Sequence, residues 1–75
     1  MTERIVVNPR ILTGKPIIRG TRIPIYLILN LLARGRKVQD IIAEYPELSK
    51  EDVVATLTYA ATVAQYETKQ LETSR

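Results

Sequence analysis

The segment GKPIIRGTRIP, residues 14–24, places two glycines, two prolines and three basic side chains in eleven positions. Glycine permits backbone conformations that other residues avoid, and proline fixes its own φ while restricting the residue before it. A long helix or strand cannot run through such a segment. We interpret it as a series of stiff turns from which Arg19 and Arg22 project.

Two short apolar pieces, separated by residues 9–16, predict a small β arm. Ile5-Val6-Val7 is β-branched and is followed by the turn former Asn8-Pro9, while Ile17-Ile18 lies between Gly14 and Gly20. A two-stranded arm is barely stable by itself. We therefore expect it to pack on helices or on another copy of the chain.

Two helices are predicted after the turns. The first runs over about residues 24–34, starts with a proline in its first turn and stops at Gly35. Besides the apolar side that faces the core, this helix has a second apolar side that carries Leu27 and Leu31. We expect this second side to be covered by the β arm or by a second subunit. The second helix follows over residues 38–45 with apolar residues at i, i+3, i+4 and i+7, and the next proline ends it.

A capping box predicts where the third helix begins. Ser49 and Asp52 have the spacing at which each side chain caps the other's backbone N–H, so the helix should start at Lys50 and run to about Thr68. Its predicted core stripe is Val53, Val54, Leu57, Ala60, Ala61 and Ala64, with Ala55, Tyr59, Thr62 and Tyr66 opposite.

The fold class that follows is mostly α. Residues 1–68 form a single domain with three helices and an N-terminal two-stranded β arm, and residues 69–75 form a polar tail. The short turn between the second and third helices fits a helix-turn-helix, although a plain helical hairpin gives the same pattern. A chain of 75 residues has a small core, so help from a partner is expected.

Composition argues against an enzyme. The chain has no Cys and no His, and neither of its two serines has a base beside it, so no catalytic residue, metal site or cofactor site is predicted. Thr13-Gly14-Lys15 lacks the second glycine of a phosphate-binding loop, and no small-molecule substrate is expected. Without a long apolar run, the chain is expected to be soluble and cytoplasmic, with no membrane partner.

Charge is distributed unevenly along the chain. Residues 1–37 contain eight basic residues and one acidic residue, a net charge of +7, whereas residues 38–75 contain three basic and seven acidic residues, a net charge of −4. Clustered cations attract nucleic-acid phosphates, although unevenly placed charges on a solvated surface explain the asymmetry equally well. The predicted DNA contacts are Arg19, Arg22, Arg36, Lys37 and Lys50.

Other exposed side chains favour a protein partner. The early exposed positions of the third helix carry no Arg, Asn or Gln to read base edges, so any DNA contact should be with phosphates. Aromatic residues combine a large contact area with a polar tip. The predicted protein interface therefore comprises Leu27 and Leu31 for a homodimer, and Tyr59, Val63 and Tyr66 for another protein.

A succession of motifs runs along the chain: Asn8-Pro9, Gly14-Lys15-Pro16-Ile17-Ile18, Gly20-Thr21-Arg22-Ile23-Pro24, Gly35, and the turn from Tyr45-Pro46 to Leu48-Ser49. This succession resembles a bacterial and archaeal family, the domain of unknown function four-three-three, described as VapB-type antitoxin-like. The resemblance covers about residues 4–61 and implies a homeodomain-like helical domain after a small β segment. Members are often encoded beside a PIN-like nuclease, which implies an antitoxin that binds this toxin and represses its own operon.

Members often carry Ser or Thr where this chain has Lys37, which removes a helix cap worth about 1 kcal/mol and adds a cation. Two hypotheses remain open. One is a dimeric antitoxin that binds both its own operator DNA and a PIN-like nuclease. The alternative is an adaptor that binds a partner protein without contacting DNA.

Overall fold

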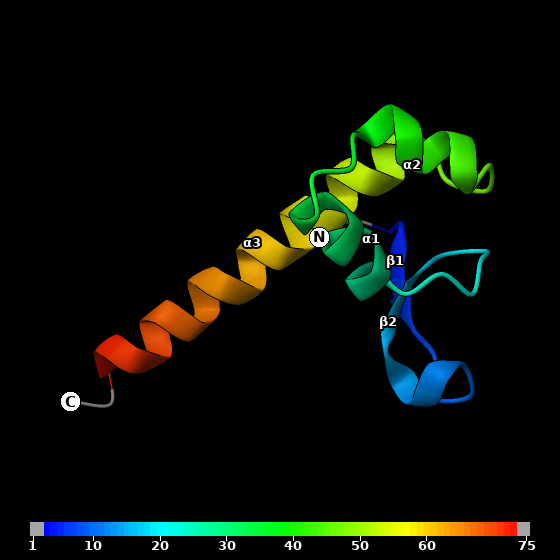
Figure 1. Ribbon diagram of the computed structural model, residues 1–75. Coiled ribbons are helices and arrows are strands. Elements are labelled where there is room, and N and C mark those ends of the chain that lie inside the picture. The colour runs from blue at the N-terminus through cyan, green and yellow to red at the C-terminus, as the bar shows by residue number, and fades with distance from the viewer. Residues whose placement is uncertain (1–2, 74–75) are drawn as a thin grey trace.

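A two-stranded sheet precedes three helices in the computed structural model, which describes the backbone of residues 3–73 and the side chains of residues 3–67 (Figure 1). The elements follow in the order β1 (Ile5–Val7), a 3-10 turn (Leu12–Gly14), β2 (Pro16–Ile18), α1 (Ile25–Ala33), α2 (Val38–Glu44) and α3 (Lys50–Thr73). The predicted fold class is confirmed.

The β arm docks on the helices of its own chain. β1 and β2 are antiparallel, with Ile5 opposite Ile18 and Val6 opposite Ile17. Only 2% of Ile17 and 1% of Ile18 is exposed, and β2 contacts α1. The side of the arm that carries Ile5 and Ile18 therefore contributes to the helical core, which stabilises a hairpin too short to persist alone.

The turns after β2 close on themselves. Gly20 has φ +81°, a left-handed conformation that glycine adopts without strain. The Thr21 hydroxyl donates to the Ile18 carbonyl at 2.8 Å and accepts from the Ile23 N–H at 3.0 Å. The Ile18 N–H in turn donates to the Ile23 carbonyl at 3.0 Å. These bonds confirm the prediction of stiff turns between the β arm and the helices.

α1 starts after Pro24 and ends as predicted at Gly35. The Arg36 N–H donates to the Leu31 carbonyl and the Gly35 N–H donates to the Leu32 carbonyl, each at 3.0 Å. This pair of bonds is a Schellman motif, which requires a left-handed residue after the helix, and Gly35 has φ +89°. The motif turns the chain sharply into the connection that leads to α2.

The capping box at the start of α3 is present. The Asp52 N–H donates to the Ser49 hydroxyl at 3.2 Å, and the Ser49 N–H donates to an Asp52 carboxylate oxygen at 3.0 Å. Leu48 and Val53 are 3% and 0% exposed, so they pack as a hydrophobic staple around this box. The turn between α2 and α3 is therefore fixed by both polar and apolar contacts.

The core lies where the three helices and the β arm meet. Ile28 of α1, Ile41 of α2 and Val53 of α3 are completely buried. These three residues join one cluster with Ile18, Ile23, Ile25 and Leu48, and partly buried side chains surround it: Ile5, Leu27, Leu31, Leu32, Val38, Tyr45 and Tyr59. All three helices and both strands thus contribute to one core.

The predicted core stripe of α3 was wrong. Val53 is buried, but 49% of Val54 and 47% of Leu57 are exposed, whereas Ala55 and Thr56 are buried. The helix is apolar on two sides, so its sequence did not specify which side packs inward. Contacts with α1 and α2 decide this, because together they cover one side only.

α3 projects far beyond the rest of the protein (Figure 1). Its 24 residues rise about 36 Å, and the molecule measures 45 Å along its longest axis. All seven side chains from Ala61 to Glu67 are exposed. The helix extends to Thr73 instead of the predicted Thr68, so it includes most of the predicted tail at 69–75, whose last two residues lie outside the described part.

Candidate functional site

The five predicted DNA contacts come from three separate parts of the surface. Arg19 and Arg22 lie in the connection between β2 and α1, and Lys50 is the first residue of α3. Arg36 and Lys37 lie in the connection between α1 and α2, well away from the β2–α1 loop in Figure 1. The fold therefore does not bring the five side chains into a single patch.

Acidic residues of α2 neutralise the corner that contains Arg36. The Arg36 guanidinium donates to the Glu44 carboxylate at 2.7 Å, and this hydrogen bond raises the pKa of Arg36 above its ordinary value. The neighbouring Lys37 is exposed, and its backbone N–H donates to an Asp40 carboxylate oxygen at 3.3 Å. Asp40 thus provides one half of a capping box, while the Lys37 side chain cannot provide the other half, since an ammonium group accepts no hydrogen bond.

A second group of cations gathers around Arg4, which sequence reasoning missed. One hollow is lined by Arg4, Arg19, Glu3 and Asp52, and an adjoining hollow by Arg4, Lys50, Glu51 and three residues of α3. Arg4 therefore connects two predicted DNA contacts that lie 31 positions apart in the sequence. Its position next to β1, in the basic half of the chain, is the sequence feature that could have indicated this role.

Two contacts fix the Arg19 and Arg4 side chains of this Arg4 group, and one of them is with an acidic side chain. The Arg19 guanidinium donates to the Glu3 carbonyl at 2.6 Å. Arg4 donates to the Asp52 carboxylate at 3.1 Å, where the Arg4 side chain is 48% exposed and that of Asp52 is 10% exposed. Asp52 offsets part of the positive charge, so the group is only weakly attractive to a polyanion.

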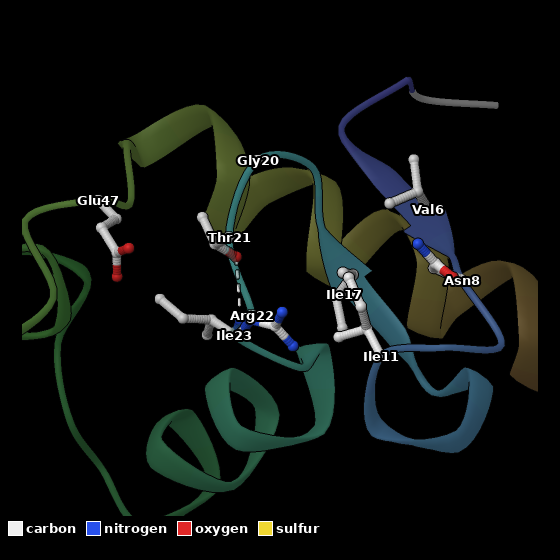
Figure 2. Close-up of a pocket in the computed structure, with 9 residues that line it drawn as sticks. All are labelled: Val6, Asn8, Ile11, Ile17, Gly20, Thr21, Arg22, Ile23 and Glu47. Atoms are coloured by element: carbon white, nitrogen blue, oxygen red, sulfur yellow. Dashed lines mark hydrogen bonds between the residues drawn. The ribbon is translucent and has the colours of Figure 1, made fainter.

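Arg22 lies apart from this group, at an open hollow between the β arm and the turn before α3. Figure 2 shows Arg22 and Thr21 on the β2–α1 loop, Glu47 on the neighbouring turn, and Ile17 beneath the loop. The hollow has a volume of about 630 Å³ and is open to solvent. It contains one cation and one acid, so it offers no concentration of positive charge for a phosphate backbone.

The two leucines predicted as a dimer contact belong largely to the monomer. Leu27 and Leu31 are half-buried and pack against the core cluster. The second apolar side of α1 is thus partly covered by the same chain. This removes much of the reason to expect a second subunit at α1.

The residues predicted to bind a partner protein lie along one side of α3 but differ in environment. Tyr59 is half-buried against the core, whereas Val63 is 40% exposed and Tyr66 is 63% exposed. Their spacing of four and three residues puts them on the side of the helix that packs on the core. Val63 and Tyr66 continue that side beyond the point where the globular part ends.

A further apolar stripe on α3 was assigned to the core by sequence reasoning and is in fact on the surface. It consists of Val54, Leu57, Ala61 and Ala64, all exposed. Between Val53 and Tyr66 the sequence contains no charged residue. The exposed positions of α3 between Val54 and Tyr66 therefore carry only apolar and neutral polar side chains.

Within residues 3–67 no group of three or more acidic, His or Cys side chains is arranged to hold a metal ion. Of the helices that the structure describes, none combines the length and the apolar character needed to cross a membrane.

Comparison with known proteins assigns the chain to a family. The profile of the family described as "Protein of unknown function (DUF433)" matches residues 5–60. The chain belongs to this family. A curated member of similar sequence, "Uncharacterized protein y4eO" of Sinorhizobium fredii, is 34% identical over 58 residues. These residues are 77% of this chain and 26% of that relative, so the chain spans about a quarter of its length.

A solved structure of the DUF433 family shares the fold. The crystal structure of a DUF433 member protein from Anabaena variabilis superposes with a TM-score of 0.77 at 26% sequence identity. The superposition covers 92% of this chain and 68% of the other. The β arm and the three helices are therefore a fold of the family.

Proposed function

We propose that this DUF433 protein is a non-catalytic protein-binding module that acts as the antitoxin of a type II pair, with a PIN-like nuclease as its partner. One observation carries the proposal. The second half of α3 leaves the globular part with all seven side chains from Ala61 to Glu67 exposed, and the only charge among them is Glu67.

Val63 and Tyr66 are the side chains through which we propose that the nuclease is bound. They lie one turn apart on the side of α3 that faces the core in its first half, and both are largely exposed. A tyrosine buries a large area at a modest entropic cost and presents a hydroxyl to the rim of an interface. An apolar partner groove would thus cover a helix surface that water solvates poorly.

Co-purification with the nuclease encoded beside this gene tests the proposal. The paired variant Val63→Glu and Tyr66→Glu should reduce capture of the nuclease at least tenfold, because it buries two carboxylates in an apolar contact. Thr62→Glu is the matched control, since Thr62 is exposed on another side of the same turn. Full capture by the paired variant would refute this interface.

Autoregulation by DNA binding is a second candidate, favoured by one observation. The connection of α2 and α3 has the order of a helix-turn-helix, and Arg4 links Arg19 with Lys50 beside the start of α3. We expect these three cations to contact mainly phosphates, because the exposed positions at the front of α3 carry no Arg, Asn or Gln to pair with a base edge.

A salt titration with the DNA upstream of the gene tests this candidate. Binding through three phosphates gives a slope of about −2.7 in log affinity against log salt. Arg19→Gln and Lys50→Gln should each make the slope less steep by about 0.9. Arg10→Gln is the control, since Arg10 is exposed and lies outside the Arg4 group, and it should leave the slope unchanged. Absence of binding at low salt would leave the protein-binding role alone.

A further inference from the structure

The exposed stripe of α3 is regularly spaced. Val54, Leu57, Ala61 and Ala64 follow one another at intervals of three, four and three residues, which keeps them on one side of a helix. Val54 and Leu57 are 49% and 47% exposed, and both alanines are exposed. The core-facing side of α3, which includes Val53 and Thr56, points in a different direction.

Two larger residues, Val54 and Leu57, are followed along the stripe by two small ones, Ala61 and Ala64, so the stripe is complementary to its own reverse. The positions of Val54 and Ala64 are symmetric about position 59, and so are those of Leu57 and Ala61. If two α3 helices lie antiparallel and cross at this level, each large side chain meets a small one. Such self-complementarity is what a two-fold interface requires, since both subunits contribute the same surface.

We propose that two copies of this chain associate through antiparallel α3 helices, with Val54 against Ala64 of the other copy and Leu57 against Ala61 of the other copy. The two alanines at the facing positions allow the helices to approach closely, as small residues do in other helix pairs. Antiparallel helices also place opposite ends of their macrodipoles side by side.

Charge supports a second copy as the occupant. The chain has a net charge of +3, so two copies repel each other except where they meet through uncharged surface. The fourteen residues from Val53 to Tyr66 are the part of α3 that carries no charge, and Thr58 and Gln65 border the stripe with neutral polar groups. Two identical helices can therefore pair here without opposing like charges.

The pairing leaves the rest of each molecule free. Because α1 and α2 pack on the core-facing side of α3, the two globular parts lie away from the shared stripe except beside Val54, which lines a hollow with Arg4 and Lys50. A single pair of helices buries less area than a standard interface of about 800 Å² per partner, so we expect a dissociation constant in the micromolar range.

This inference does not depend on the proposed function. The nuclease contact uses Val63 and Tyr66, which lie on the core-facing side of α3 and not in the stripe. Loss of dimerisation with retained nuclease capture, or the reverse, would therefore separate the two proposals.

Sedimentation of the full chain over a range of about 1 to 500 μM tests the association. The wild type should change from the mass of one chain to that of two as the concentration rises. Leu57→Lys and Ala61→Lys should each weaken association at least tenfold, whereas Thr62→Lys, at an exposed position outside the stripe, should leave it unchanged. Circular dichroism checks that the variants keep their helices.

A wild type that remains a single chain throughout this range would overturn the proposal. The same conclusion would follow if the stripe variants associated as strongly as the wild type, because the contact would then lie elsewhere. Both outcomes can be interpreted because Leu57 and Ala61 are exposed, so their substitution does not disturb the core.

Disulfide trapping tests the antiparallel orientation, and the absence of native Cys makes single-cysteine variants unambiguous. The Leu57→Cys and Ala61→Cys variants are given tags of different length, so that their cross-linked products can be told apart by size. When the two variants are mixed and oxidised, the main product should be a disulfide between one Leu57→Cys chain and one Ala61→Cys chain. In the antiparallel pair, identical positions are offset by about 6 Å along the helices, so each variant alone should cross-link poorly. Preferential cross-linking of each variant with itself would show a parallel pair and refute the arrangement.

Discussion

Arg4 donates to the carboxylate of Asp52 at 3.1 Å and so ties the residue before β1 to the first turn of α3, 48 positions further along the chain. Asp52 is only 7% exposed, and the same carboxylate accepts the Ser49 N–H. One acidic side chain therefore completes a helix cap and anchors the β arm to the helices.

Loss of this carboxylate should destabilise the fold markedly. Asp52→Ala removes the Arg4 contact and leaves the Ser49 N–H without its acceptor, so the free energy of unfolding should fall by about 2 kcal/mol. Arg4→Met should cost less than about 1 kcal/mol, because nearly half of the Arg4 side chain is exposed and screened. Urea unfolding measures both variants, and equal losses would show that the ion pair dominates over the cap.

Two adjacent valines should respond very differently to truncation. Val53 is fully buried and Val54 is 49% exposed. Val53→Ala should lower the free energy of unfolding by about 2 kcal/mol, because it leaves a cavity in the core. Val54→Ala should change it by less than about 0.5 kcal/mol. Urea unfolding at low protein concentration, where self-association does not contribute, measures both variants. A larger loss of free energy of unfolding for Val54→Ala than for Val53→Ala would mean that α3 is rotated about its axis.

The contrast between these valines shows how far the sequence can be interpreted. Local signals determined the element boundaries well: Gly35 ended α1, and the Ser49 and Asp52 capping box started α3. The orientation of α3 could not be predicted in this way, since the helix is apolar on two sides and tertiary contacts select the buried one.

The charged sites show the same limit. Clusters of cations in the sequence suggested one basic surface, but Glu44 lies against Arg36 and Asp52 against Arg4. Both acids come from the second half of the chain, and their pairing with cations of the first half depends on the fold. Composition by halves therefore overestimated the positive surface, and Arg4 could be recognised as a central residue only from the structure.

Replacement of Gly35 should weaken the end of α1. The residue has φ +89°, and no atom lies within 4 Å of a Cβ added there, so the cost is conformational and not steric. Gly35→Ala should lower the free energy of unfolding by about 1 kcal/mol, and Gly35→Asn by less, because Asn tolerates the left-handed conformation. Thermal unfolding of the two variants compares them; a larger loss for Asn would argue against the Schellman motif.

The pair of Arg36 and Glu44 should depend on salt but not on mild alkali. The hydrogen bond that Arg36 donates to Glu44 raises the pKa of Arg36 above its ordinary value, so the stabilisation from this arginine is present below the ordinary pKa and is lost only as the pH rises through the higher, folded-state pKa. Arg36→Gln should therefore lower the melting temperature slightly and equally at about pH 7 and pH 10, and less in about 1 M salt. A difference that grows between the two pH values would indicate another titrating partner.

The amides of α3 should exchange with solvent at two different rates. From Lys50 to Ala60 the helix packs on α1, α2 and the β arm, so exchange there requires opening of the core. From Ala61 onward the described side chains are exposed, and an isolated helical segment of this length is marginally stable in water. Hydrogen exchange followed by NMR should thus be fast in the second half at low protein concentration.

Because antiparallel pairing would cover Ala61 and Ala64, the same amides should become protected as the concentration rises, and Leu57→Lys should abolish this protection. Equal exchange rates in the two halves of the dilute protein would mean that the projecting helix is stabilised without a partner.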